Sequence, residues 1–362
     1  MKPVQVVWFK RDLRLHDHAP LRRALESPEL PLLLLFIEEP FYEEDPHYHL
    51  RHRWFIRESL EDMHRQLSAF GGKVHIFRGS AAEVFDYLSS QWEVRRVISY
   101  EETGMEVTYA RDRFMKAWFK HRGISWIELP QPGVVRGLQQ RENWHSSWQR
   151  EMDAPLCQVD FAKARWPKVL VPDCRRPAEM PSYEGQHLHQ TGGSTEAKAW
   201  LHSFCAQRSK RYRFSISKPG HAVLGCSRLS PYLAWGNLSL REVVQEAKAH
   251  KLERAFRSRL HWNRHFVQKL ETQPDIEFKN MNPAVDGLRT DCPDSLLEAW
   301  KYGKTGYPMV DACMRQLRQT GYLNFRMRAM VVSFATHHLW LPWQSISPWL
   351  ASCFLDFEPG IH

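Results

Sequence analysis

The chain has 362 residues, of which 43% are hydrophobic, and it carries a formal net charge of +9. This length is enough for two domains, each with a core of its own. The chain lacks an apolar run long enough for a membrane span and begins without the apolar stretch of a signal peptide, which favours a cytoplasmic protein. The seven scattered cysteines argue against a disulfide framework or a zinc ribbon. The positive charge favours a polyanionic partner.

Residues 1–130 alternate predicted strands with predicted helices. The apolar runs that predict buried strands are residues 4–9, 32–37, 74–77, 96–99 and 124–129. The segments with helical periodicity are residues 51–70, 81–88 and 107–119. Repeated strand–helix–strand units predict a parallel sheet with helices on both faces, so we assign an α/β domain to residues 1–130.

Residues 131–195 break this pattern with repeated prolines and no apolar periodicity, which predicts a long linker. We expect the linker to wrap the domains, because it contains apolar side chains that need cover: Trp144, Trp148, Phe161 and Trp166. Beyond it the apolar period is helical, which assigns an all-helical domain to residues 196–362. Helices are predicted at residues 196–205, 229–235, 240–249, 256–270, 309–318 and 324–339.

The first strand runs directly into a charged segment that extends from Lys10 to Asp17. Ligands of open α/β sheets bind at the carboxyl ends of strands, so this segment is a candidate ligand site. The alternative is a solvated loop with local ion pairs. The strand is not followed by a Gly-x-Gly-x-x-Gly sequence, which argues against an ordinary dinucleotide site here.

A second segment combines hydroxyl groups, a cation and a predicted helix start. Ser227 and Ser230 are expected to cap a helix that has Pro231 in its first turn, with Arg228 between them. Exposed amides, two hydroxyls and a guanidinium suit a phosphate group. The alternative is an ordinary capped helix.

Later segments contain further charged pairs. Asp311 and Arg315 have i, i+4 spacing and are expected to pair on one helix face. Arg326 and Arg328 cannot share a face of a regular helix, so we expect them to serve different partners, such as DNA and a cofactor. The alternative is two surface arginines.

Histidine clusters do not predict a metal site. His261 and His265 have a spacing that can hold a metal, but the sequence offers no third ligand nearby. A second cluster, which we expect at the surface, consists of His47, His49 and His52.

Taken together, three segments resemble the signatures of the photolyase/cryptochrome family, in the family's order. They are residues 7–14, residues 227–236 and residues 305–317. The resemblance covers nearly the whole chain and implies an α/β antenna-type domain, a long linker and an all-helical domain that holds FAD in a U shape. It also implies a folate or deazaflavin antenna in some members.

The resemblance assigns roles to individual residues. Those that match cofactor-binding positions are Tyr212, Ser227, Arg228, Leu229, Ser230, Arg328, Asp356 and His362. Arg328 and Asp356 match the pair beside the isoalloxazine, and His362 matches the neighbour of flavin N5. Trp343 matches the middle tryptophan of the electron-transfer chain, and Trp262 an aromatic side chain of the cavity for a flipped pyrimidine dimer. Glu106 matches the glutamate that holds a folate antenna.

Several positions depart from the family pattern. Arg259 replaces the glutamate that the best-known photolyases use against the dimer, Phe325 replaces an asparagine, and Thr290 stands for the outer tryptophan. These departures weaken the expectation of dimer repair and leave flavin binding untouched. We expect Arg259, Trp262 and Arg326 to contact DNA. The run that ends at His362 continues in the family, so we expect a fragment with weak or absent flavin.

The sequence therefore predicts a monomeric flavoprotein that repairs pyrimidine dimers in DNA with light. The alternatives are a cryptochrome-like blue-light photoreceptor without repair activity and an inactive fragment. Lesion type and antenna identity stay open.

Overall fold

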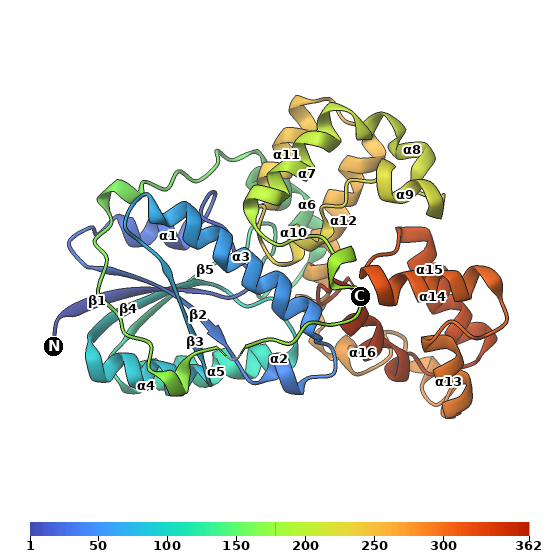
Figure 1. Ribbon diagram of the computed structural model, residues 1–362, viewed down its shortest axis with the longest axis horizontal. Coiled ribbons are helices and arrows are strands. Elements are labelled where there is room, and N and C mark those ends of the chain that lie inside the picture. Colours follow the sequence, from blue (N-terminus) through green and yellow to red (C-terminus); the bar gives the residue numbers. More distant parts are fainter. Residues whose placement is uncertain (178, 362) are drawn as a thin grey trace.

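The N-terminal part is a five-stranded parallel sheet covered on both faces by helices (Figure 1). The computed structural model describes residues 1–177 and 179–361. The strands are β1 (Pro3–Phe9), β2 (Leu32–Glu38), β3 (Val74–Arg78), β4 (Glu93–Tyr100) and β5 (Ser125–Leu129), in the order β3-β2-β1-β4-β5. All five predicted strands are therefore confirmed. Their apolar runs are continuous because both faces of a parallel sheet are buried.

Side chains of β1 alternate between two hydrophobic layers. Val4, Val6 and Trp8 pack against the helices α4 (Ala81–Gln91) and α5 (Glu106–His121). Val7 and Phe9 pack on the opposite face, against α1 (Ala19–Leu25) and α3 (Leu50–Ser68). Short helices such as α1 and α2 (Phe41–Glu44) were not predicted, because one or two turns carry too little apolar periodicity.

The segment 131–195 contains more structure than predicted. The helix α6 (Trp144–Asp153) lies within it, together with four short 3₁₀ turns. The sequence did not predict this helix, because it is short and is stabilised by the burial of Trp144, Trp148 and Met152 in tertiary contacts. Trp144, Trp148 and Phe161 are buried, and Trp166 packs against the same core, so the predicted cover is present.

The C-terminal part is helical, as predicted. Its helices are α7 (Ser194–Ala206), α8 (Tyr212–Ser215), α9 (Pro219–Gly225), α10 (Ser230–Ala234), α11 (Leu240–Ala249), α12 (Arg254–Thr272), α13 (Asp294–Lys301), α14 (Pro308–Thr320), α15 (Phe325–Ser333) and α16 (Trp343–Cys353). The predicted helix 324–339 is α15 followed by a π-helical turn, Phe334–His338. α16 escaped prediction, since Pro348 stands inside it and interrupts a helical pattern.

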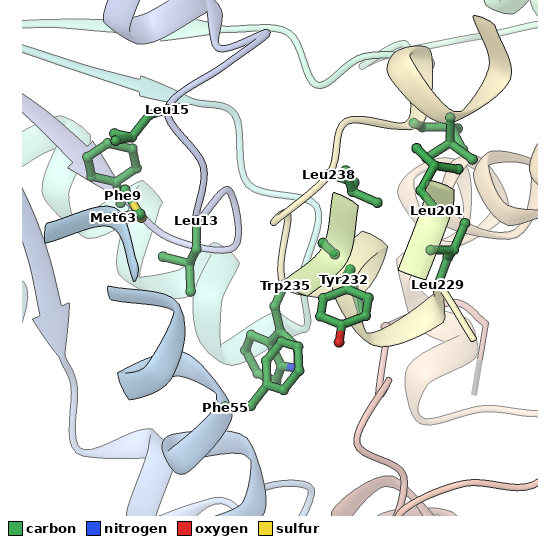
Figure 2. Close-up of a cluster of buried hydrophobic side chains, with 14 of the residues drawn as sticks. Phe9, Leu13, Leu15, Phe55, Met63, Leu201, Leu229, Tyr232, Trp235 and Leu238 are labelled. Carbon is green, nitrogen blue, oxygen red and sulfur yellow. The ribbon is translucent and has the colours of Figure 1, made fainter. Parts of the chain in front are cut away.

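The helices α7, α10 and α11 share a hydrophobic core with the N-terminal part. Phe55 of α3 lies 5.6 Å from the ring of Tyr232 on α10, and Trp235 follows on the same side (Figure 2). The helices α13 to α16 have a separate core around Trp300. This division leaves α15 and α16 facing α8 and α12 across the middle of the molecule (Figure 1). No helix among the described residues is long and apolar enough to span a membrane.

The charged segment after β1 is buried between the two parts of the chain. Asp12 contacts His18 at 2.7 Å, Arg14 donates to the carbonyl of Gly236 at 3.1 Å, and Asp17 pairs with Arg241 at 2.5 Å. The alternative of a solvated loop is therefore wrong. These side chains are buried because the helical part packs directly over the carboxyl end of β1, which local sequence cannot reveal.

Candidate functional site

A cavity of about 860 Å³ lies between the helices α8, α10, α12, α15 and α16 and the segment 356–361. This volume is within the range of small-molecule sites in proteins. Most of the residues that the sequence singled out line it: Tyr212, Ser227, Arg228, Ser230, Arg259, Trp262, Arg328, Trp343 and Asp356. Residues 212 to 356 are far apart in sequence, so the fold brings them together.

Arg228 gives one end of the cavity a buried positive charge. The residue is 8% exposed and has a left-handed backbone with φ of 61°, which is uncommon for a residue with a side chain. Its Nε donates to Gln190 Oε1 at 3.1 Å, and its guanidinium lies 3.9 Å from the ring of Tyr322. Burial lowers the pKa of the Arg228 guanidinium. A buried cation held by neutral groups favours an anionic ligand.

The residues around Arg228 are arranged differently from the predicted helix cap. Ser227 and Ser230 line the cavity, but Leu229 is the N-cap of α10, and the cap makes no side-chain hydrogen bond. The capping prediction is wrong, because the helix begins at Ser230 itself and the apolar Leu229 occupies the N-cap position. Leu229 is 1% exposed and packs in the hydrophobic core (Figure 2).

Tyr212 forms part of the wall beside this end. Its ring packs edge-on against Phe204 at 5.8 Å and Phe256 at 5.5 Å. Burial raises the pKa of the Tyr212 phenol, so the hydroxyl remains a neutral hydrogen-bonding group. This wall is rigid because both aromatic neighbours belong to helices of the shared core.

A partly buried ion pair lines the cavity. Arg328 Nη2 lies 2.7 Å from Asp356 Oδ2, and Arg328 Nε donates to the carbonyl of Leu323 at 2.9 Å. The guanidinium also lies 4.2 Å from the ring of Phe354. Arg326 is exposed and does not share this position, so the two arginines face different surroundings as the helical spacing predicts.

Aromatic rings and a cation surround the outer part of the cavity. The guanidinium of Arg259 lies 4.3 Å from the ring of Phe325 and 5.0 Å from that of Trp262. Trp262 is 45% exposed. Trp343 is half-buried, and its indole N–H donates to Asn280 Oδ1 at 2.7 Å. This arrangement presents flat apolar faces beside a positive charge, which is what stacking on nucleic-acid bases requires.

Glu106 lies at the N-terminus of α5, where the two parts of the chain meet. Its backbone N–H donates to the carboxylate of Glu277 at 2.8 Å, and its own carboxylate pairs with Arg113. Glu277 lines the cavity, and burial raises its pKa. Glu106 is therefore next to the cavity wall rather than in it. The predicted site residue His362 lies outside the described residues.

The predicted pair of Asp311 and Arg315 is arranged differently in the structure. Asp311 does not pair with Arg315: its carboxylate accepts from the backbone N–H groups of Thr305 and Gly306 at 2.8 and 3.0 Å. Arg315 instead donates to the carbonyl of Gly303 at 2.6 Å. Both side chains bind the backbone of the loop before α14, because the N–H and C=O groups of this loop need hydrogen-bond partners.

The histidines are placed for packing. His52 is fully buried, which makes its predicted surface location wrong, and His261 contacts His145 at 3.0 Å. His52 belongs to the apolar face of α3, whose burial depends on the helical part. Within residues 1–177 and 179–361, no group of three or more His, Cys, Asp or Glu side chains could hold a metal ion.

Sequence reasoning missed several residues that shape the cavity. Gln190 and Tyr322 hold Arg228, and Met105 and His47 of the N-terminal part line the wall. Gln190 lies in the proline-rich linker, where no periodicity or motif marks it. Only the three-dimensional path of the linker places it against Arg228.

Comparison with known families covers both parts of the chain. Residues 5–136 match the family described as DNA photolyase, and residues 256–362 match the FAD binding domain of DNA photolyase. The chain belongs to the photolyase/cryptochrome family. The resemblance inferred from the sequence is thereby confirmed, and this family member contains a FAD-binding domain.

Named relatives include both photolyases and cryptochromes. The chain is 26% identical to cryptochrome DASH of Synechocystis sp., over 98% of this chain and 78% of that protein. It is 27% identical to deoxyribodipyrimidine photo-lyase of Vibrio cholerae, over 98% of this chain and 80% of that protein. The two kinds of relative are thus about equally similar to this family member.

Solved structures agree on the fold. A bacterial class III photolyase from Agrobacterium tumefaciens superposes with a TM-score of 0.85 at 24% identity, over 100% of this chain and 78% of that one. A Synechocystis cryptochrome gives a TM-score of 0.85 at 23% identity, over 100% of this chain and 80% of that one. The predicted architecture, a parallel-sheet domain followed by a helical domain, is confirmed.

Proposed function

We propose that this chain binds FAD in the central cavity, contrary to the weak or absent flavin expected from the sequence, and uses light to repair pyrimidine dimers in DNA. The observation that carries the proposal is the convergence of Arg228, Arg328 and Asp356 on one cavity of about 860 Å³. The relative from Vibrio cholerae is named a deoxyribodipyrimidine photo-lyase, which supports the same activity here. The proposed domains are residues 1–130, a linker at 131–195 and the FAD-binding domain at 196–362, although the shared core shows that they pack as neighbours.

The cavity fits the chemistry of FAD. Arg228 supplies a buried cation, and Ser227 and Ser230 supply hydroxyl groups at the same end, which together suit the diphosphate. Tyr212 forms the adjoining wall. The Arg328–Asp356 pair would lie beside the isoalloxazine, where its two charges can orient the polar edge of the ring. Bound FAD would supply light-driven electron transfer, and the protein supplies position and electrostatics.

The outer part of the cavity would accept a nucleotide turned out of the duplex. A dimer distorts the duplex, so it costs less to flip than a normal base pair. Trp262 and Phe325 offer apolar faces for the flipped bases, while Arg259 and the exposed Arg326 would contact phosphates. The net charge of +9 adds a general attraction to DNA. Trp343, which also lines the cavity, would pass electrons toward the flavin.

The second candidate function is that of a cryptochrome-like photoreceptor without repair activity. It is favoured by the identity of Arg259, since a cation held between Phe325 and Trp262 lies where the family resemblance leads us to expect a carboxylate. A guanidinium donates hydrogen bonds and cannot accept one from a pyrimidine imide. Similarity to cryptochrome DASH supports this reading.

A second chromophore is a further part of the proposal. A neighbouring structure, an archaeal photolyase from Sulfolobus tokodaii, is described with two FAD molecules. In this chain Glu106 would hold a folate antenna, and a deazaflavin is the alternative. Its carboxylate pairs with the exposed Arg113 of the same helix.

One preparation tests the proposed function. The purified chain is examined for visible flavin absorbance, then mixed with an oligonucleotide that contains a pyrimidine dimer and exposed to blue light. Repair predicts loss of dimers in the light and not in the dark. Flavin photoreduction without loss of dimers would establish the photoreceptor reading, and a protein that stays colourless with added FAD would contradict both. Gel filtration of the same sample tests the expected monomer.

A further inference from the structure

The segment that carries Asp356 into the cavity is held by side chains of the N-terminal domain. It begins at Cys353, the last residue of α16, and runs to Phe357. Arg51 of α3 donates through Nη1 to the carbonyl of Cys353 and through Nη2 to that of Arg318 at 3.1 Å. The next residue, His52, contacts the carbonyl of Phe354 through Nε2 at 2.8 Å. Two consecutive residues of α3 thus bind two consecutive carbonyls of this segment.

The other end of the segment is held in the same way. Arg11, which follows β1, donates through Nη2 to the carbonyl of Phe357 and through Nε to that of Ala234 at 3.2 Å. Its guanidinium lies 4.5 Å from the ring of Trp235. The indole N–H of Trp235 donates to the carbonyl of Leu355 at 2.9 Å. The carbonyls on both sides of Asp356 therefore have partners. That of Phe357 accepts from Arg11 of the N-terminal domain, and that of Leu355 accepts from Trp235, whose ring lies against Arg11.

These contacts are made in a dry interface. His52 is 0% exposed and Arg51 is 5% exposed. His52 Nδ1 accepts from the backbone N–H of His49 at 3.2 Å, so in the neutral ring the proton is on Nε2 and points to Phe354. Arg51 places its charge at the C-terminal ends of α14 and α16, where the carbonyl groups of a helix favour a cation. Such contacts are strong because water cannot replace them.

We propose that the N-terminal domain acts as a positioning element for the cofactor cavity. Arg51, His52 and Arg11 fix the backbone on both sides of Asp356 and so hold its carboxylate against Arg328. The proposal rests on the proposed binding of FAD for its functional consequence, but its structural part concerns the chain alone. None of these three residues would need to touch the cofactor: they act through Asp356.

Hydrogen exchange of the protein without cofactor tests the structural part. His52→Leu removes the donor to Phe354, while His52→Gln keeps an N–H that can reach it. His75, another buried histidine of the same domain on β3, provides the matched control as His75→Leu. We expect faster amide exchange at residues 353–357 in His52→Leu, near wild-type exchange in His52→Gln, and no change there in His75→Leu. Equal protection of this segment in all four proteins would overturn the proposal.

A double-mutant cycle on FAD affinity tests the functional part. His52→Leu should weaken FAD binding about tenfold, as expected when a buried hydrogen bond that fixes a ligand group is lost. In the Asp356→Asn background the same change should cost less than about twofold, because the group that it positions is already disabled. Equal losses in both backgrounds would show that His52 acts on general stability, which contradicts the proposal.

Two outcomes are kept separate by this design. If the wild-type chain binds no FAD, the proposed function fails, while the exchange experiment still decides whether α3 holds the segment. If His52→Leu does not fold, Arg51→Met takes its place, with Arg51→Lys as the conservative variant that keeps the charge. Rescue of segment protection by Arg51→Lys supports the proposal, and failure of Arg51→Met to open the segment overturns it.

Discussion

Arg228 and Gln190 form a closed pair of hydrogen bonds. The Nε of Arg228 donates to Gln190 Oε1 at 3.1 Å, and Gln190 Nε2 donates to the carbonyl of Arg228 at 2.9 Å. One side chain of the linker thus holds both the guanidinium and the strained backbone of a residue with φ of 61°. The linker is therefore part of the proposed cofactor site.

Removing the two hydrogen bonds between Gln190 and Arg228 should lower the affinity for FAD, although Gln190 is not itself proposed to contact FAD. Gln190→Leu removes both of these hydrogen bonds, and hydrogen bonds to a charged group contribute about 1.5–3 kcal/mol. We expect the dissociation constant of FAD to rise about tenfold or more, measured by quenching of flavin fluorescence. Gln186→Leu, a glutamine of the adjacent 3₁₀ turn, is the matched control and should leave the affinity unchanged. An unchanged affinity in Gln190→Leu would separate the linker from the site.

The serines beside Arg228 should act together. The double change Ser227→Ala and Ser230→Ala removes two hydroxyl groups that line the cavity, and Arg228→Ala removes its buried charge. We expect weaker FAD retention in both variants, with the larger loss in Arg228→Ala because a charged hydrogen bond is stronger than a neutral one. Ser258→Ala, on the exposed face of α12, is the control. Full flavin occupancy after gel filtration of the double variant would refute the phosphate assignment.

Binding to DNA should depend steeply on salt. Phosphate contacts release counterions, so the logarithm of the binding constant falls linearly with the logarithm of salt concentration. Arg259→Ala and Arg326→Ala should each reduce the magnitude of this slope by about 1, because each would remove one phosphate contact. Arg95→Ala, an exposed arginine on β4 paired with Glu93, should leave it unchanged. A flat dependence for the wild-type chain would contradict the proposed DNA site.

Acid should destabilise the fold through buried neutral histidines. Burial lowers the pKa of His52 to about 3, so the unfolded chain, with an ordinary value near 6.5, binds a proton that the folded chain rejects. The free energy of unfolding should therefore be unaffected by His52 above about pH 6.5 and fall below it by about 1.4 kcal/mol per pH unit. His52→Gln cannot titrate and should show a shallower fall in denaturant unfolding at pH values down to about 5. An identical slope in both proteins would mean that His52 is protonated in the fold.

Trp343 should affect the rate of flavin photoreduction and not the affinity for FAD. Indole gives up an electron more readily than a phenyl ring, so Trp343→Phe should slow flavin photoreduction at least several-fold while the FAD dissociation constant stays within about threefold. Trp340→Phe is a suitable control, because Trp340 is 49% exposed and lies outside the cavity lining. The decay of visible flavin absorbance under blue light measures the photoreduction rate of each variant, and quenching of flavin fluorescence measures its FAD dissociation constant. Equal rates in the two variants would exclude Trp343 from the electron path.

Features that depend on neighbours in the chain were predictable. The strand β2 is a run of seven buried residues, six of them apolar. Such a run predicts a sheet that is covered on both faces, because alternate side chains point to opposite faces. Ser227, Arg228 and Ser230 could be recognised as one group because they are adjacent in sequence and reach the same cavity. The helix α11 was predicted with its observed bounds, since its apolar spacing is regular and Ser239 caps it.

Features that depend on contacts between distant segments were decided by the tertiary structure alone. Asp12 and Asp17 look like members of a solvated loop until the helical domain covers them, since burial is a property of the packed molecule. His52 and Gln190 carry no local signal, yet the first holds the segment of Asp356 and the second holds Arg228. A side chain in a sequence shows its chemistry, but its partners, and therefore its pKa and its role, are set by whichever groups the fold brings within hydrogen-bonding distance.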